Sequence, residues 1–205
     1  MIRTPIIITL PGFYDNETDA VCALADAGAD IIHFRKPDAG EENLNLWLGA
    51  IPENYRDNLT IHYRIDLAEK YMLGSIHSKI TDLKTFENPD LRKSTSCHSW
   101  EEVENAEGIA DYVFLSPVFD SVSKEGYKSA FDHGFLKEKL NGINIRTKVV
   151  ALGGIASDNI GTIKDIGFDG VAMIGSIWSV KENKIDIEKT TANYIKIMEE
   201  WQKKL

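Results

Sequence analysis

The sequence predicts an α/β protein, a compact single-domain (β/α)8 barrel of the TIM type that spans residues 1–205. Three observations favour this fold. A unit made of a helix end, a glycine, an aspartate and a buried strand recurs at 26–35, 105–114 and 165–174, and such units are typical of βα crossovers in a parallel sheet. Two late strands run directly into glycines, as in barrels that bind a phosphate. Eight segments have the pattern of strands, which favours a closed barrel over the alternative, a flavodoxin-like open sheet.

The expected strands are short apolar or alternating runs, and the stretches between them have the pattern of helices. Strands are expected at 5–10, 30–35, 58–63, 75–77, 94–98, 111–115, 147–151 and 169–173. Helices are expected at 15–27, 41–50, 66–73, 99–107, 131–140, 156–166 and 185–203. The crossover around 80–90 has a weak pattern, so we expect a poor helix or a loop there.

Several helix ends carry specific signals. Asp15 and Ser99 have the residue types and positions of N-caps. Glu102, three residues after Ser99, completes the pattern of a capping box. After the last strand, Ile177 is expected to begin a short extra helix.

Composition and charge limit the classes of partner. A net charge of −9 argues against binding to nucleic acid or to an anionic membrane. The apolar run 6–10 is too short for a signal peptide or a membrane helix. Cys22 and Cys97 both lie in predicted regular elements, which indicates no disulfide and fits a reducing compartment. We therefore expect a cytoplasmic protein whose partner is a small-molecule phosphate, with homo-oligomerisation left open.

Four of the five histidines fall at the ends of consecutive predicted strands. His33 ends the second strand, His62 the third, His77 the fourth and His98 the fifth. Because the C-terminal ends of barrel strands meet at one mouth, all four are candidate catalytic residues, as acid/base groups near neutral pH or as polar contacts to a heterocycle. The alternative is that each is a structural residue. Spacing along strands predicts nothing about tetrahedral geometry, so no metal ligands are assigned.

A phosphate cradle is expected after the last two strands. Gly153, Gly154 and Gly175 lack side chains at places where an anion could approach the backbone, and Ser176 adds a hydroxyl. The alternative is a pair of tight turns without a ligand.

The loop after the sixth strand is expected to bind a second anion. It carries Ser121, Ser123 and Lys124, and hydroxyls with an ammonium group suit a phosphate or diphosphate. Arg35, at the end of the second strand, is expected to close on the same anion. An ordinary solvated loop is the alternative.

These motifs, in their order and spacing, resemble the thiamine phosphate synthase/TenI family over essentially the full length of the chain. The segments that carry the resemblance are Ile61-His-Tyr-Arg-Ile-Asp-Leu-Ala68, Ser96-Cys-His-Ser99, Asp111-Tyr112, Ser116-Pro-Val-Phe-Asp-Ser-Val-Ser-Lys124, Ala151-Leu-Gly-Gly-Ile155 and Gly167-Phe-Asp-Gly-Val-Ala172. The resemblance implies the compact barrel of that family, with Arg35 at the family's diphosphate arginine and Ser96 at its serine on the fifth strand.

The resemblance also implies two activities. Synthases of the family join a hydroxymethylpyrimidine diphosphate to a thiazole phosphate and release pyrophosphate, with Mg2+ bound by aspartates. In this chain the third-strand Asn-Asp pair is His62-Tyr63, and the Gln-x-Asp after the fourth strand has no counterpart in Ser78-Lys79-Ile80. The absence of these aspartates favours the second activity, that of a TenI-like thiazole tautomerase or a divergent enzyme, which moves a proton and needs no diphosphate-bound metal.

Two features keep the other possibilities open. The tautomerase histidine that the family carries before Val-Phe is Pro117 here, as it is in synthases. A genuine synthase that uses Mg2+ therefore remains an alternative. A non-catalytic barrel that binds thiamine intermediates, or another barrel isomerase that uses a phosphate, is a further one.

Overall fold

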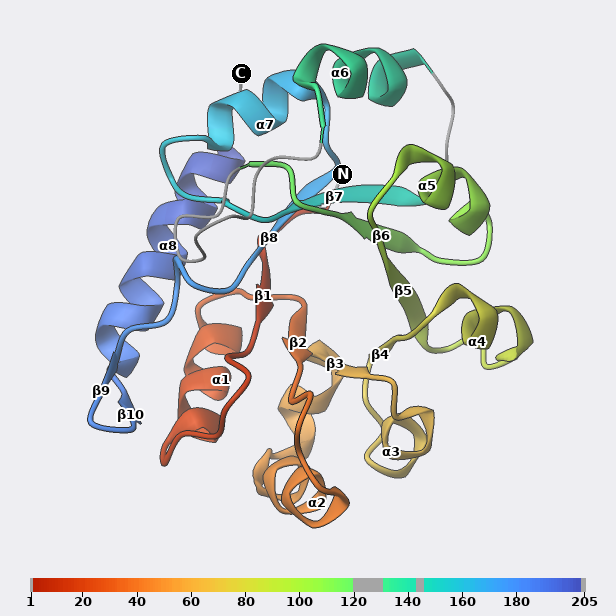
Figure 1. Cartoon of the computed structure of the whole chain (residues 1–205). Helices are drawn as coiled ribbons and strands as arrows, with labels where there is room; N and C mark the ends of the chain where they lie inside the picture. The colour runs from red at the N-terminus through yellow and green to blue at the C-terminus, as the bar shows by residue number, and fades with distance from the viewer. Residues whose placement is uncertain (1, 120–130, 143–145, 204–205) are drawn as a thin grey trace.

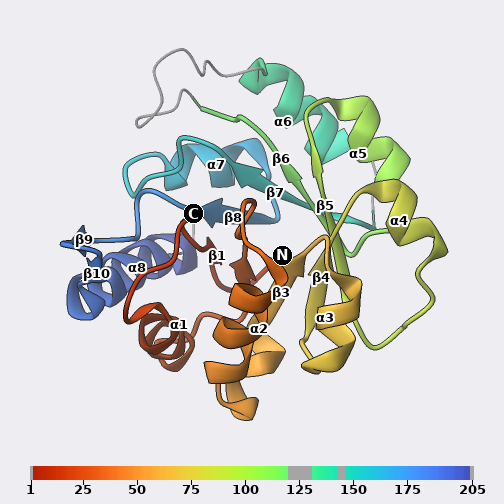
Figure 2. The ribbon, with the colours of Figure 1, turned by 60° about the horizontal axis from the view of Figure 1, so that its bottom comes forward.

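Eight parallel strands form a closed barrel in the computed structural model, which describes residues 2–119, 131–142 and 146–203. Neighbouring strands follow one another in chain order from β1 to β8, and β1 closes on β8 with Ile6 opposite Ala172. The helices lie outside the strands (Figures 1 and 2). This closure confirms the predicted (β/α)8 fold and excludes the open sheet.

The barrel strands are β1 (Ile6–Ile8), β2 (Ile32–Phe34), β3 (Leu59–His62), β4 (Ser75–His77), β5 (Arg92–Cys97), β6 (Tyr112–Leu115), β7 (Lys148–Leu152) and β8 (Gly170–Met173). The helices are α1 (Glu17–Asp26), α2 (Glu41–Ala50), α3 (Ile65–Lys70), α4 (Ile80–Thr85), α5 (Trp100–Ala106), α6 (His133–Gly142), α7 (Ile160–Ile166) and α8 (Ile187–Gln202). A 3-10 helix, η1 (Glu53–Asn58), precedes β3, and a hairpin of β9 (Val180–Lys181) and β10 (Lys184–Ile185) precedes α8. The weak crossover at 80–90 thus holds one short helix.

The expected helix ends are partly confirmed. Ser99 caps α5, since its hydroxyl accepts the backbone N–H of Glu102 at 3.2 Å. Asp15 is not the cap of α1, which begins after Asn16; the carboxylate of Asp15 instead accepts a hydrogen bond from Asn183 of the β9–β10 turn.

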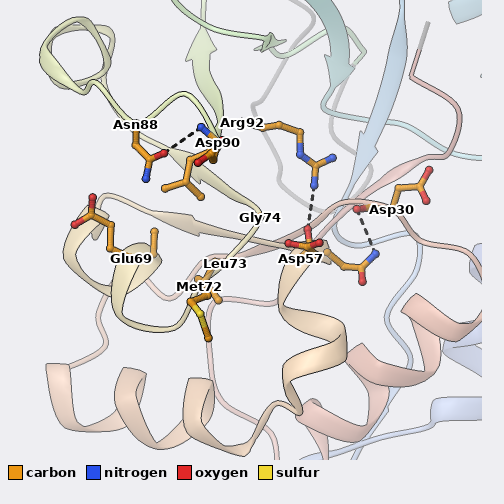
Figure 3. Close-up of a pocket in the computed structure, with 12 residues that line it drawn as sticks. Asp30, Asp57, Glu69, Met72, Leu73, Gly74, Asn88, Asp90 and Arg92 are labelled. Atoms are coloured by element: carbon orange, nitrogen blue, oxygen red, sulfur yellow. Dashed lines mark hydrogen bonds between the residues drawn. The ribbon is translucent and has the colours of Figure 1, made fainter.

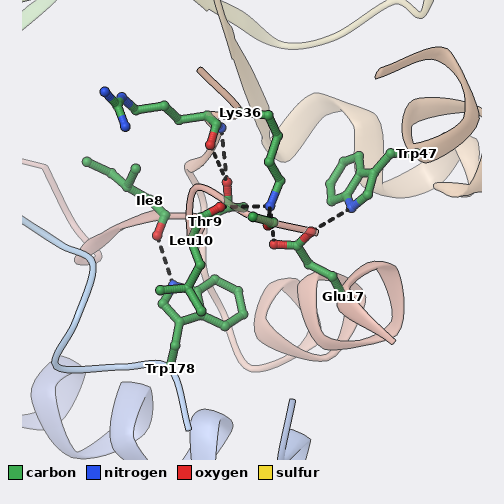
Figure 4. Close-up of polar contacts among 9 residues, drawn as sticks. Ile8, Thr9, Leu10, Glu17, Lys36, Trp47 and Trp178 are labelled. Carbon is green, nitrogen blue, oxygen red and sulfur yellow. Dashed lines mark hydrogen bonds and ion pairs between the residues drawn. The ribbon is translucent and has the colours of Figure 1, made fainter. Parts of the chain in front are cut away.

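The prediction of an extra helix after the last strand is wrong. The backbone at Ile177 closes a turn, in which its N–H donates to the carbonyl of Ile174, and the chain continues into the hairpin. Trp178 turns back toward the barrel, and its indole N–H donates to the carbonyl of Ile8 at 2.9 Å (Figure 4). This contact holds the segment after β8 against β1.

Alternation along the strands separates two apolar regions. Residues such as Ile32, Ile61 and Ile76 point outward and pack with the apolar faces of the helices. Inward positions of β1, β6, β7 and β8, with the residue before β2, fill the inside of the barrel with a second, smaller set: Ile6, Ile8, Ile31, Tyr112, Phe114, Val150 and Ala172.

The barrel interior is polar along β2 to β5. The inward residues of these strands are histidines, serines and a threonine. The interiors of other barrels mostly carry Val, Ile or Leu at such positions. The buried members of this set are His33, Thr60, Ser75, His77 and Ser94. A polar interior on one side of the barrel is the main departure from an ordinary barrel core, and it lies where the candidate site begins.

A buried ion pair joins the chain after β1 to the end of β2 (Figure 4). The ammonium group of Lys36 donates to Glu17 at 2.6 Å and to the carbonyls of Leu10 and Gly12. The second carboxylate oxygen of Glu17 accepts the indole N–H of Trp47 at 3.0 Å. All three donors of Lys36 are thereby used inside the fold, so this lysine is not available at the mouth.

Two further findings bear on the sequence expectations. Cys22 and Cys97 are free thiols, the first half-buried and the second buried. Within the described ranges, no helix is both long and apolar enough to cross a membrane.

Candidate active site

Three imidazoles meet at the C-terminal ends of β2, β3 and β4. His33, His62 and His77 occupy inward positions of neighbouring strands, and His62 pairs in register with His77. One ring nitrogen of each lies within 4.8 Å of the others. We call these three residues the histidine cluster.

A hydrogen-bonded chain runs through two members of the cluster. The Tyr112 hydroxyl lies 2.7 Å from Nε2 of His33, and Nδ1 of His33 lies 3.0 Å from Nε2 of His62. The remaining nitrogen of His62, Nδ1, is buried and has no hydrogen-bond partner in the described part of the chain. Since a buried polar atom without a partner costs about 1–3 kcal/mol, this atom points to a contact with a ligand.

The third imidazole is held by two serines. The Ser94 hydroxyl donates to the carbonyl of Ile76 at 3.2 Å, so it accepts from Nδ1 of His77, which lies 2.9 Å away. Nε2 of His77 therefore carries the lone pair and accepts from Ser96 at 3.0 Å. Ser96 thus contacts the cluster, although its role in binding substrate is untested.

Burial lowers the pKa of His33 and of His62 well below the ordinary value, and it lowers the pKa of His77 to about 3. The nearby guanidinium of Arg35 adds to the lowering of the pKa of His62 and His77. Neutral imidazoles with such low pKa values are poor proton acceptors but good ligands and hydrogen-bond partners.

His98 lies apart from the other three histidines. Its side chain is exposed beyond the end of β5, and Nδ1 lies 3.0 Å from the carbonyl oxygen of Ser116. A carbonyl oxygen only accepts, so Nδ1 carries the proton and Nε2 carries the lone pair. Among the described residues Nε2 has no hydrogen-bond partner. The expected group of four histidines is therefore a cluster of three and one oriented imidazole on the rim.

The two glycines after β7 have left-handed backbones, with φ of 96° at Gly153 and 67° at Gly154. A Cβ on Gly153 would also lie 3.0 Å from Cα of Pro117. Packing against Pro117, after β6, therefore requires glycine at position 153. The sequence-based interpretation explains this glycine by the approach of a ligand. The carbonyl of Gly154 accepts from Asn159 at 2.7 Å, just before α7 begins.

The end of β8 supplies the other half of the expected cradle. Gly175 is exposed, and Ser176 is half-buried with a hydroxyl that is buried and lacks a hydrogen-bond partner among the described residues. Because β7 and β8 are neighbours in the barrel, this hydroxyl belongs to the same side of the mouth as the glycines after β7. An unpartnered hydroxyl there is available to an anion.

Arg35 keeps its side chain exposed at the mouth while its backbone is fixed. Its N–H donates to the hydroxyl of Thr9 on the neighbouring β1 segment at 3.0 Å. The expected partners on the loop after β6, Ser121, Ser123 and Lys124, lie outside the described residues.

Three residues near the site were not singled out from the sequence. Tyr112 and Ser94 hold the histidine cluster, and the alternation of polar and apolar residues along β5 could have placed Ser94 inside the barrel. Tyr63 adopts a left-handed backbone (φ 61°) at the end of β3 with its side chain 58% exposed. A bulky residue in this conformation is uncommon and occurs where a site constrains the backbone.

A pocket with a volume of about 910 Å3 lies at the opposite pole (Figure 3). It is lined by residues before the starts of β3, β4 and β5, among them Asp57, Glu69 and Asp90. Arg92 spans it, and its guanidinium donates to the carbonyl of Asp57 at 3.0 Å. The N-terminal pole of a barrel serves stability rather than chemistry, so we place the site at the other end.

A closed parallel barrel with its polar groups at the C-terminal strand ends defines the class of (β/α)8 proteins whose sites are built from the βα loops. A profile of the family described as thiamine monophosphate synthase matches residues 6–177, and the chain belongs to this family. The chain is 32% identical over 168 residues to the thiamine-phosphate synthase of Alkaliphilus oremlandii, covering 76% of this chain and 77% of that protein. It is 33% identical over 166 residues to that of Desulfitobacterium hafniense, covering 77% and 79%.

Solved structures agree with this assignment. The thiamine phosphate pyrophosphorylase of Bacteroides thetaiotaomicron superposes with a TM-score of 0.81 at 29% identity, covering 98% of this chain and all (100%) of that one. The Pyrococcus furiosus enzyme of the same name has a TM-score of 0.73 at 23% identity with 98% coverage of both chains, which supports the fold.

The residues present do not fit the Mg2+ that the family implies. Tyr63 stands at the position of one of the family's two aspartates, and the spacing after His77 puts the second position at Asp82, so only one of the two carboxylates is present. Asp82 accepts a hydrogen bond from the Ser78 hydroxyl at 2.7 Å, and the neighbouring Asp66 is paired with Arg64 at 2.7 Å. Mg2+ requires oxygen ligands in near-octahedral geometry, which these side chains do not offer.

Proposed function

We propose that this protein is a thiamine-biosynthesis enzyme that binds a thiazole phosphate at the barrel mouth and moves a proton with His98, in the manner of a thiazole tautomerase. The observation that carries the proposal is the rim imidazole, exposed and held through Nδ1 by the carbonyl of Ser116. An imidazole whose Nδ1 is fixed by a carbonyl, and whose Nε2 has no partner among the described residues, has the arrangement of a general base.

The proton transfer is balanced without a further reactant. Nε2 of His98 takes a proton from one position of the thiazole precursor, and the resulting imidazolium returns a proton to another position. The bonds within the ring rearrange and the net charge is unchanged. Positioned acid/base groups of this kind contribute about 10²–10⁴ in rate.

The phosphate is proposed to bind between the ends of β7 and β8. The backbone at Gly154 and Gly175 and the unpartnered hydroxyl of Ser176 would contact it. The positive charge of Arg35 at the mouth favours an anion in a protein whose net charge is −9. Ser121, Ser123 and Lys124 stay predicted contacts of a second anionic group.

A genuine synthase is the second candidate, because the curated relatives are named thiamine-phosphate synthase and the Bacteroides structure is named thiamine phosphate pyrophosphorylase. In that reaction the thiazole nitrogen displaces pyrophosphate from the hydroxymethylpyrimidine diphosphate. The two candidates differ in one requirement, since a synthase must hold the leaving diphosphate.

Two parallel assays separate the candidates. One follows a thiazole carboxylate phosphate by NMR in D2O, and we expect isomerisation with deuterium uptake. The other supplies hydroxymethylpyrimidine diphosphate, thiazole phosphate and Mg2+, and we expect no thiamine phosphate. Efficient thiamine phosphate formation would establish the synthase instead, whereas binding of thiazole phosphate with neither product would indicate a binding protein.

The role of His98 has a matched control. His98→Asn should lower turnover by about 10²–10⁴ while the protein still melts higher with thiazole phosphate. His133→Asn, which changes the histidine on α6 that contacts the carbonyl of Val118, should keep the wild-type rate. Full activity of the His98 variant would refute the assignment of the base.

A further inference from the structure

The histidine cluster has the donor set of a transition-metal site. Three neutral imidazoles converge from β2, β3 and β4, and one nitrogen of each lies within 4.8 Å of the others. Imidazole binds Zn2+, Cu2+, Fe2+ and Ni2+ well, whereas Mg2+ prefers oxygen. Three histidines with an open fourth position are also a known arrangement for catalytic zinc.

The cluster is supported by residues that orient its rings. Ser94 accepts from Nδ1 of His77, so Nε2 carries the lone pair, and a bound ion would replace the contact of this nitrogen with Ser96. Tyr112 lies 2.7 Å from Nε2 of His33, which leaves Nδ1 facing His62. Metal-binding histidines characteristically have the second nitrogen engaged in this way, because the partner fixes the tautomer and the ring orientation.

We propose that His33, His62 and His77 bind one divalent transition-metal ion of the Zn2+ class inside the barrel, beneath the mouth. The fourth position of the ion is left for water or for an anionic group of the ligand. This site differs from the family's aspartate-bound Mg2+ in both its ligands and its metal. Metal binding here is independent of the proposed proton transfer by His98.

Metal binding would draw the three ligand nitrogens, which lie within 4.8 Å of one another, closer together. Zn–N bonds of about 2.0–2.1 Å at tetrahedral angles place ligand nitrogens about 3.3 Å apart. The closest pair, Nδ1 of His33 and Nε2 of His62, is already 3.0 Å apart. The buried Nδ1 of His62 has no partner in the described part of the chain. A rotation of that ring would bring either of its nitrogens to the ion.

The surrounding charges set the expected behaviour. Burial and the neighbouring positive groups, Arg35 near His62 and His77 and Arg92 near His33, all lower the pKa of the cluster. These two guanidinium groups oppose a cation at the cluster, so an anion at the fourth position should strengthen metal binding.

Cobalt spectroscopy tests the site without any substrate. The purified full-length chain is stripped with a chelator, dialysed and titrated with Co2+, whose four-coordinate complexes have intense visible bands. We expect these bands to saturate at one Co2+ per chain and to disappear on addition of Zn2+. Mg2+ should neither produce nor displace the signal. Absence of the bands in the wild-type protein would overturn the proposal.

Variants locate the ion. His62→Asn should weaken Co2+ binding by about 100-fold or more, whereas His133→Asn should bind as the wild type does. Tyr112→Phe keeps all three ligands and should weaken binding by about 10–100-fold, which tests the orienting role and serves if His62→Asn does not fold. Circular dichroism verifies the fold of each variant. Unchanged Co2+ affinity in both His62→Asn and Tyr112→Phe would place the ion elsewhere and refute the site.

Discussion

Replacing Lys36 by Met should destabilise the barrel strongly because it isolates a buried carboxylate. The side chains of Lys36 and Glu17 are 0% and 1% exposed, and their charged atoms are 2.6 Å apart. Without the ammonium group, Glu17 retains one hydrogen bond from a side chain, the indole of Trp47 at 3.0 Å. The carbonyls of Leu10 and Gly12 also lose their donor.

The size of the effect follows from the cost of an unpaired buried charge. Breaking a buried ion pair by removing one partner costs about 3–5 kcal/mol of unfolding free energy. Domains are stable by only about 5–15 kcal/mol, so the loss is a large fraction of the total. Glu17→Leu combined with Lys36→Met removes both charges, and the double variant should lose about 1–3 kcal/mol less than the sum of the single variants.

The deficit should depend on pH with a defined sign. Burial already raises the pKa of Glu17 above 4.5, and the attraction of Lys36, which opposes this rise, is lost in the variant. A carboxyl whose folded pKa is raised contributes stability below its unfolded pKa, and this contribution is lost as the pH rises through the folded pKa. Lys36→Met should therefore be closer to the wild type at pH 5 than at pH 8.

Urea unfolding followed by tryptophan fluorescence and by far-UV circular dichroism measures these differences, provided that the two transitions coincide. The four proteins of the cycle are compared at pH 5 and pH 8. A loss below 1 kcal/mol in Lys36→Met at pH 8 would refute the reasoning, as would strict additivity in the double variant.

Three glycine substitutions test the packing of the barrel. Gly74→Ala should cost about 3 kcal/mol or more or abolish folding, because its Cβ would lie 2.0 Å from the carbonyl oxygen of Asp57, whereas Gly49→Ala, with nothing within 4 Å, should raise the melting temperature. Gly153→Ala should cost about 1–3 kcal/mol, since φ is +96° and Cα of Pro117 lies 3.0 Å from the new Cβ, and it should reduce the melting shift caused by thiazole phosphate. Thermal melts with and without thiazole phosphate measure each effect. Equal melting temperatures of Gly74→Ala and Gly49→Ala would contradict the first expectation. A melting shift with thiazole phosphate that is unchanged in Gly153→Ala would contradict the second.

Local patterns in the sequence were sufficient for the architecture. The helix–glycine–strand units predicted the parallel strands, and all eight expected strands overlap observed ones. The cap at Ser99 could also be predicted from the sequence. The capping hydroxyl accepts a hydrogen bond from an amide only three residues further along the chain. Asp15 failed as a cap because its carboxylate found a partner at Asn183, far along the chain.

The site could be predicted only in part. The sequence placed His33, His62 and His77 at neighbouring strand ends, and closure of the barrel brings them together. His98 likewise ends its predicted strand. In the structure, however, it lies beyond the last paired residue of β5, and its side chain turns to the rim.

The sequence by itself determined which residues are strands, which strands are neighbours and which chemistry gathers at the mouth, because these follow from periodicity and order along the chain. Only the tertiary structure decided which atoms meet. Glu17 captures Lys36, Pro117 excludes a side chain at Gly153, and Tyr112 reaches His33 across the barrel. The physical reason is that strand register and tilt bring distant residues within hydrogen-bonding distance, and no local pattern encodes those distances.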